Sequence, residues 1–81
     1  MIKDVLMEQL AHQIQTLIGQ RMPFGKYQGR WLIDLPVAYL QWFERKGFPA
    51  GTLGEQLQLL YQLKMDGNGD VLRDLHRRMI G

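Results

Sequence analysis

The sequence predicts an α+β fold that is mainly helical, with an N-terminal helix, a β-hairpin and then three helices packed on one core. Two patterns predict it. Apolar residues recur at helical spacing in four segments, and after the first segment the pattern changes to short aromatic and β-branched runs. At 81 residues, 46% hydrophobic and 22% charged, the chain is expected to form a single domain over residues 1–81.

The first helix is expected from about Ile2 to Ile18, and Gly19 closes it. Its charged face is neither strongly basic nor lined by tryptophan, so we expect a helix that faces the core rather than a membrane surface. The apolar residues at helical spacing are Ile2, Val5, Leu6, Leu10, Ile14, Leu17 and Ile18.

A β-hairpin is expected from Phe24 to Ile33, because Gln28-Gly29 can supply the two positive-φ positions of a two-residue turn. Gly25 and Gly29 are interpreted as turn glycines that also allow close backbone approach. A two-stranded hairpin leaves both edges open, so pairing of two copies through a hairpin edge is a hypothesis for a homodimer.

The register of this hairpin pairs Tyr27 with Arg30 and Lys26 with Trp31. Lys26 would then lie across the ring of Trp31, and Arg30 across the ring of Tyr27. Both arrangements allow cation–π contacts, which places basic and aromatic side chains together at the turn.

The second helix follows directly. Asp34 is expected to cap it, with Pro36 in the first turn, where a missing N–H costs nothing. The helix should end at Gly47, which permits a left-handed cap, with Phe48 folding back near Phe43.

Two further helices are expected after it. Thr52-Leu-Gly-Glu55 fits a capping box at the start of the third, which should end before the loop Asp66-Gly-Asn-Gly69. The last helix should begin near Asp70. Its acids come early and its arginines late, as the helix dipole favours; these arginines are Arg73, Arg77 and Arg78.

Composition excludes most catalytic chemistry. The chain has no cysteine and no serine, which removes disulfides, thiolate zinc sites and serine or cysteine nucleophiles. His12 and His76 lie on separate predicted helices, so a zinc site is not expected. No pair of acids shows the spacing of a paired-carboxylate site, and we expect no enzyme activity, cofactor or metal.

Two loops superficially resemble ligand motifs. Asp66-Gly-Asn-Gly-Asp70 matches the first acidic positions of an EF-hand, but Val71 stands where the loop needs glycine and Arg77 where it needs the bidentate glutamate. Gly25-Lys-Tyr-Gln-Gly29 is too short for a phosphate loop and no Ser or Thr follows it. Neither predicts a site.

The N-terminus carries acids among its apolar residues and does not form the apolar run of a signal peptide, and no segment approaches the length of a membrane span. We therefore expect a cytoplasmic, bacterial protein without a membrane partner.

The remaining candidate is a basic and aromatic cluster. Seven of the eight aromatic residues lie between Phe24 and Phe48, interleaved with cations, although the net charge is only +2. Cations suit phosphates and exposed rings can stack on bases, so DNA or RNA is one candidate partner. The alternative is that most of these rings simply form the core. The candidate nucleic-acid-binding residues are Lys26, Tyr27, Arg30, Arg45 and Lys46.

The same region carries a resemblance. Met22-Pro-Phe-Gly-Lys-Tyr-Gln-Gly-Arg30, Asp34-Leu-Pro36, Tyr39-Leu-Gln-Trp-Phe43, Lys46-Gly-Phe-Pro49 and Leu53-Gly-Glu55 resemble a family of small bacterial proteins described as "putative quorum-sensing-regulated virulence factor". The match covers about residues 22–64. This family has no settled biochemical role to transfer, and a link to virulence would rest on its description alone.

The shorter pattern Phe-Gly-Lys-Tyr-x-Gly, with Leu-Pro and Tyr-Leu-x-Trp after it, is also similar to the C-terminal module of exodeoxyribonuclease X-like proteins. That resemblance implies a non-catalytic accessory module whose shared contacts fall on Gly25, Lys26, Tyr27 and Gly29. We therefore expect a module that binds nucleic acid through the basic aromatic hairpin. The alternative is a regulatory or scaffolding protein that binds a protein partner.

Overall fold

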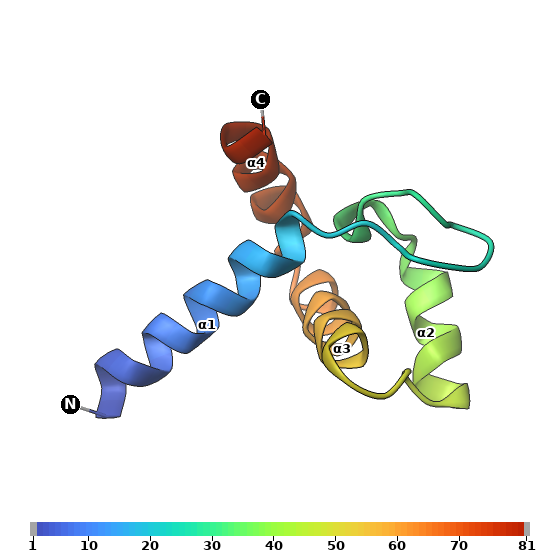
Figure 1. Cartoon of the computed structure of the whole chain (residues 1–81), viewed down its shortest axis with the longest axis horizontal. Coiled ribbons are helices and arrows are strands. Elements are labelled where there is room, and N and C mark those ends of the chain that lie inside the picture. The colour runs from blue at the N-terminus through green and yellow to red at the C-terminus, as the bar shows by residue number, and fades with distance from the viewer. Residues whose placement is uncertain (1, 81) are drawn as a thin grey trace.

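A computed structural model describes residues 2–80 of the chain, with side chains described for residues 5–79. Its regular elements are all helical and no strand forms among these residues, so the predicted α+β class is wrong while the mainly helical character is confirmed. In chain order (Figure 1) the elements are α1 (Ile2–Ile18), the short 3₁₀ helix η1 (Leu32–Asp34), α2 (Val37–Lys46), α3 (Thr52–Met65) and α4 (Gly69–Ile80).

The expected β-hairpin is replaced by an irregular loop over residues 19–31, here called the 19–31 loop. A two-residue turn at Gln28-Gly29 needs positive φ at both positions, but Gln28 does not adopt it. Positive φ is confined to the glycines, at +80° in Gly25 and +86° in Gly29. The chain therefore reverses over a wider turn, and the Gln28 N–H donates to the Gly25 carbonyl at 3.1 Å.

Of the two pairs in the predicted register, Tyr27 with Arg30 and Lys26 with Trp31, only the first is joined by a backbone hydrogen bond. Other bonds of this loop join residues that lie further from the turn on its N-terminal side. The Met22 N–H donates to the Arg30 carbonyl at 2.7 Å, and the Gly29 N–H donates to the Met22 carbonyl at 2.8 Å. An isolated antiparallel bridge joins Arg21 to Trp31. The Arg30 N–H donates to the Tyr27 carbonyl at 3.1 Å and not back to Met22, so the pairing does not extend along the chain as a ladder.

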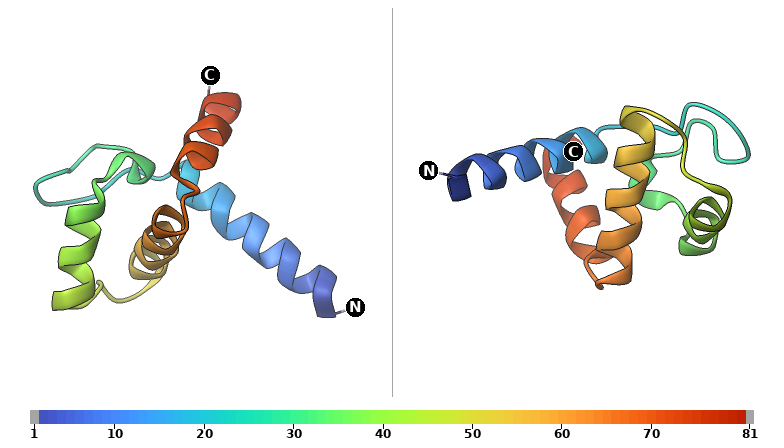
Figure 2. Two further views of the ribbon diagram at one scale, coloured as in Figure 1. Left: turned by 180° about the vertical axis from the view of Figure 1, so that it is seen from behind. Right: turned by 90° about the horizontal axis from the view of Figure 1, so that it is seen from below.

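The predicted bounds of α1 are confirmed, but its predicted orientation holds only at its C-terminal end. Leu17 and Ile18 are buried, whereas Leu6 and Leu10 are 58% and 41% exposed. Figure 2 shows α1 extending away from the rest of the molecule, with only its last turns against the other helices. The first half of this amphipathic helix has no apolar partner among the described residues.

The core forms where the C-terminal end of α1, η1, α3 and α4 meet. Leu32 and Ile33 of η1 are buried, as is Leu35 just after it, and α2 completes the core by packing on α3. Burial of these aliphatic side chains supplies the main driving force for folding. The buried core residues are Leu17, Ile18, Met22, Leu32, Ile33, Leu35, Leu40, Phe43, Leu57, Leu60 and Leu72.

The end of α2 at Gly47 is as predicted, but neither predicted cap forms, because the ψ of +132° in Gly47 lies outside the left-handed helical region. Gly47 has φ of +107° and its N–H donates to the Phe43 carbonyl at 2.6 Å, while the Phe48 ring lies 6.0 Å from that of Phe43. At the other end Asp34 belongs to η1, and Pro36 is the N-cap without a side-chain hydrogen bond.

Helix α3 begins without the predicted capping box. Gly51 is the N-cap and no side chain caps the helix; the Glu55 N–H donates to the Gly51 carbonyl at 3.2 Å. Thr52 is already the first helical residue, so its hydroxyl is not placed at the cap position. The predicted end of α3 at Met65 and the start of α4 next to Asp70 are confirmed.

Of the helices described over residues 2–80, none combines the length and the apolar character needed to cross a bilayer.

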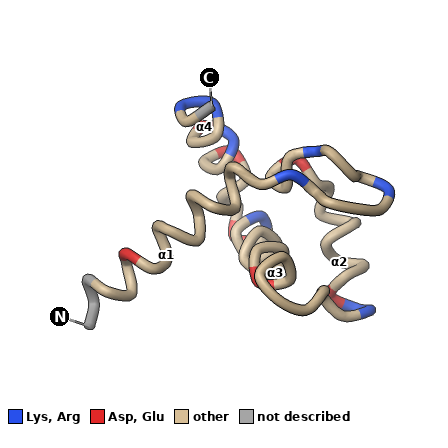
Figure 3. Tube along the Cα trace, in the orientation of Figure 1, with Lys and Arg blue, Asp and Glu red and all other residues tan. Residues whose placement is uncertain are grey.

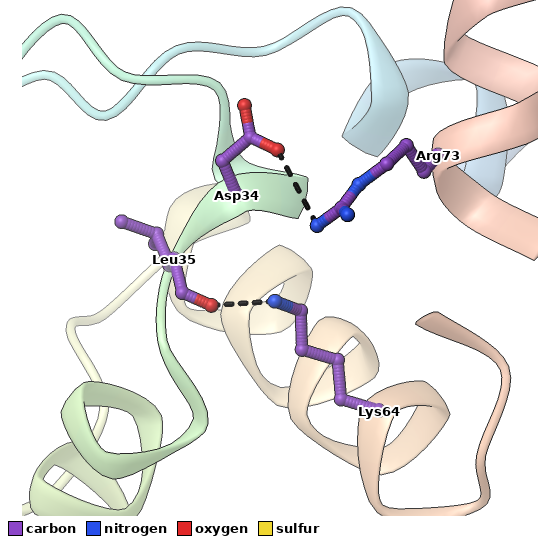
Figure 4. Close-up of polar contacts among 4 residues, drawn as sticks. All are labelled: Asp34, Leu35, Lys64 and Arg73. Carbon is purple, nitrogen blue, oxygen red and sulfur yellow. Dashed lines mark hydrogen bonds and ion pairs between the residues drawn. The ribbon is translucent and has the colours of Figure 1, made fainter. Parts of the chain in front are cut away.

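Lys64 joins α3 to the η1 segment (Figure 4). Its Nζ donates to the Leu35 carbonyl at 2.5 Å, and beside it Arg73 of α4 lies 4.0 Å from Asp34. Both partners of that ion pair are exposed and contribute little, but the Lys64 contact is partly buried. We expect Lys64→Met to lower the free energy of unfolding by about 1–2 kcal/mol because the Leu35 carbonyl loses its charged donor.

Denaturant unfolding measured against pH tests this contact. Burial, with the nearby Arg73 charge, lowers the pKa of Lys64 below its ordinary value of 10.5. Between the lowered pKa and 10.5 the unfolded chain binds more protons than the folded one, so the contribution of Lys64 to stability rises with pH. The variant lacks this rise. Exposed Lys46→Met is the control, and equal effects of the two substitutions would contradict the assignment.

Candidate functional site

The 19–31 loop docks on α2 through two tyrosines. The rings of Tyr27 and Tyr39 meet edge to face with centroids 4.7 Å apart and an interplanar angle of 62°. Gly25 lies directly beside them: a Cβ at this position would sit 3.4 Å from the Tyr39 hydroxyl oxygen, in a backbone conformation that L side chains rarely adopt. Glycine at position 25 therefore lets the loop approach α2 closely.

An open groove of about 590 Å³ separates the loop tip from the outer face of α2; we call it the aromatic groove. Its volume is within the range of ligand sites. Two of its rings are conspicuously accessible, since Phe24 and Trp42 are each 45% exposed. The lining residues are Phe24, Gly25, Lys26, Tyr27, Pro36, Ala38, Tyr39, Trp42 and Phe43.

The rings along α2 are held in place by one another. Trp42 and Tyr39 are nearly parallel, with an interplanar angle of 2° and centroids 6.4 Å apart. Buried Phe43 meets both rings edge to face, at 5.0 Å from Tyr39 and 5.1 Å from Trp42. Such contacts fix ring orientation, so the groove presents pre-oriented aromatic faces to the solvent.

The electrostatics of the aromatic groove are simple. Burial raises the pKa of Tyr39, with a further contribution from Tyr27, so its hydroxyl stays neutral at physiological pH. Lys26 is the charged residue of the lining, with its Nζ 5.5 Å from the centre of the Tyr27 ring. No carboxylate belongs to the lining residues, which favours an anionic or neutral ligand over a cation.

Of the five predicted binding residues, two line this groove and three lie outside its lining. Lys26 and Tyr27 line it, and Arg30 is exposed on the same loop. Arg45 and Lys46 are in the last turn of α2, three and four residues after Trp42, so they lie on the same side of the helix as that ring. Figure 3 shows cationic positions on the loop and at the C-terminal end of α2.

The predicted cation–π pairs are rearranged. Arg21, and not Lys26, lies over the Trp31 ring, with its guanidinium carbon 3.8 Å from the ring centre, and its Nη1 donates to the Gly29 carbonyl at 2.7 Å. Trp31 is also edge to face with His76 at 4.7 Å. The shifted backbone pairing opposes Arg21 to Trp31, so both stabilise the base of the loop.

Sequence reasoning did not place three rings in the site: Phe24, Tyr39 and Trp42. From the sequence alone, each of these rings could belong to the core. One signal was available, because the apolar residues of the ten-residue α2 cover more than half of its circumference. Leu40 and Phe43 face the core, so the remaining arc must face something else.

The other sequence candidates do not gather into a site. His12 lines a separate small cavity of about 140 Å³ between α1 and α3, while His76 packs on Trp31. Within the part of the chain that the structure describes, no three His, Cys, Asp or Glu side chains are grouped as metal ligands would be. The loop before α4 is a helix connection in which Gly67 adopts positive φ.

The fold and the groove define a small helical module with a ligand-accessible aromatic surface. The chain belongs to the family described as "putative quorum-sensing-regulated virulence factor", whose model matches residues 10–75. The family match thus extends beyond residues 22–64 on both sides and is confirmed. The similarity to exodeoxyribonuclease X-like proteins is not shown.

Two curated proteins are similar over most of the chain. They are the "Uncharacterized protein YpeB" of Escherichia coli (strain K12) and that of Escherichia coli O157:H7. Each is 49% identical over 71 residues, which cover 86% of this chain and 93% of the relative. No solved structure matches the chain.

Proposed function

We propose that this protein is a non-catalytic module that binds single-stranded nucleic acid in the aromatic groove. The observation that carries the proposal is the pair of accessible rings, Phe24 on the loop and Trp42 on α2, in a groove whose lining also includes Lys26. Unpaired bases expose π faces on which such rings stack, whereas the bases of a duplex are already stacked.

The cations support the same ligand. Lys26 lines the groove, Arg30 is exposed on the same loop, and Arg45 and Lys46 follow Trp42 on α2. The acid nearest to them in sequence, Glu44, is two residues from Trp42 and so faces the other side of the helix. A phosphodiester backbone that passes the groove would meet positive charge at both ends.

Charge reversal tests the proposal. We expect Lys26→Glu/Arg30→Glu to weaken binding of a labelled single-stranded oligonucleotide at least about tenfold and to flatten its dependence on salt, because phosphate contacts are lost. Fluorescence anisotropy across a salt series measures both quantities. Circular dichroism checks that the exposed substitutions leave the helices intact.

Arg77→Glu/Arg78→Glu is the matched control, because it makes the same change of charge at exposed positions of α4. It should retain most of the affinity. Equal losses in the two double variants would reduce the effect to net charge and contradict the proposed site. Absence of binding by the wild-type protein at low salt would overturn the function and leave a protein partner as the alternative.

A further inference from the structure

Residues 6–14 of α1 carry an apolar stripe that the other described residues of the chain leave uncovered. Leu6, Met7 and Leu10 are 58%, 65% and 41% exposed, and the partly buried Ile14 continues their line toward the core. These four residues, here called the α1 stripe, share one side of the helix, because Leu10 lies four residues after Leu6 and three after Met7, and Ile14 lies four after Leu10. Single exposed apolar side chains are ordinary, but a contiguous row marks an interaction surface.

We propose that the α1 stripe pairs with the α1 stripe of a second copy of this chain, antiparallel and about a two-fold axis at Leu10. In that register Leu10 meets Leu10, and Leu6 of each copy meets Ile14 of the other. Each stripe then runs into the buried Leu17 of its own core, so that one apolar layer continues through both copies.

The charge pattern favours a second copy over other occupants. Glu8 is the only Asp, Glu, Lys or Arg from residue 5 to residue 18, and it lies on the side of the helix opposite Leu10. Two such faces meet without repulsion, and antiparallel helices align their dipoles favourably. A membrane-surface helix needs a basic polar face, and this segment has no lysine or arginine.

The area of the α1 stripe determines how tightly we expect the dimer to associate. Leu6 to Ile14 spans about 12 Å along the helix. Such a stripe offers on the order of 500 Å² per copy, close to the lower end of specific interfaces, so we expect a dissociation constant in the micromolar range. The dimer would leave both aromatic grooves free, because the groove lies on the loop and α2. It therefore does not depend on the proposed function.

Sedimentation velocity of the wild-type chain tests this proposal, over concentrations from about 1 µM to about 1 mM. The mass should rise toward that of two chains. Leu10→Glu should stay monomeric throughout, because it places two carboxylates against each other at the axis. Leu6→Glu, at a second exposed position, should weaken the dimer by the same mechanism, and circular dichroism confirms folding of each variant.

Gln15→Glu is the control, because it adds the same charge at an exposed position on the far side of α1. It should still dimerise. A wild-type chain that stays monomeric overturns the proposal, and its binding to anionic lipid vesicles would then assign the stripe to a membrane surface. A dimer that survives Leu10→Glu and Leu6→Glu, or that Gln15→Glu also abolishes, overturns the proposal as well.

Discussion

Trp42→Ala is expected to weaken the binding of a single-stranded oligonucleotide by about 5- to 150-fold, because one base loses a stacking platform worth about 1–3 kcal/mol. The ring is 45% exposed and lies on the groove side of α2, so its removal leaves the buried core intact. Fluorescence anisotropy measures the affinity, and denaturant unfolding shows whether stability is retained.

Two variants separate stacking from a general loss of apolar surface. Trp42→Phe keeps an aromatic face and should retain much of the affinity. Met65→Ala shortens an apolar side chain that is 55% exposed at the end of α3, remote from the groove lining, and should bind like the wild type. If Met65→Ala and Trp42→Ala weaken binding equally, the aromatic groove is not the binding surface.

Gly54→Ala is expected to lower the free energy of unfolding by about 3 kcal/mol, a large part of the roughly 4–12 kcal/mol typical for a domain of this length. Gly54 is in the first turn of α3, and a Cβ there would overlap the carbonyl group of Pro49. The obstacle is backbone, so the 47–51 connection or the start of α3 must move. Urea unfolding monitored by circular dichroism measures the loss.

Gly69→Ala supplies the comparison. Gly69 begins α4, and the nearest atom to an added Cβ there is the Lys64 Cγ at 4.0 Å, an ordinary contact. This variant should unfold close to the wild type. A Gly54→Ala protein of wild-type stability would show that the Pro49 carbonyl does not lie against Gly54.

Local sequence signals predicted the helices because their causes are local. Apolar spacing identified α1, and Gly47 marked the end of α2, where it has a positive φ that only glycine adopts at little cost. The capping box of Thr52 and Glu55 failed for an equally local reason, since Gly51 takes the N-cap position one residue earlier.

The β-hairpin was a wrong prediction because its turn depends on tertiary contacts. Gln28-Gly29 can form a two-residue turn only if Gln28 accepts positive φ. In the fold, the packing of Tyr27 on Tyr39 and the bridge between Arg21 and Trp31 impose a wider reversal. Neither contact is visible in the spacing of residues 24–33.

Part of the candidate site could be predicted from the sequence, because glycines mark the position of a loop. The sequence placed Lys26 and Tyr27 at an accessible loop, and both line the aromatic groove. It could not separate core rings from groove rings. Phe43 and Trp42 are neighbours in the sequence, yet one is buried and the other is 45% exposed, because successive helical residues face different directions.

Isotope-labelled protein can be titrated with an unlabelled single-stranded oligonucleotide of about eight nucleotides while the amide and tryptophan side-chain NMR signals are recorded. Binding in the aromatic groove predicts shifts over residues 24–30, over residues 38–46 and at the indole N–H of Trp42. The signals of Val71 and of the residues around it should stay in place. Shifts confined to α1, α3 or α4, or no shifts at low salt, would contradict binding of the oligonucleotide in the aromatic groove.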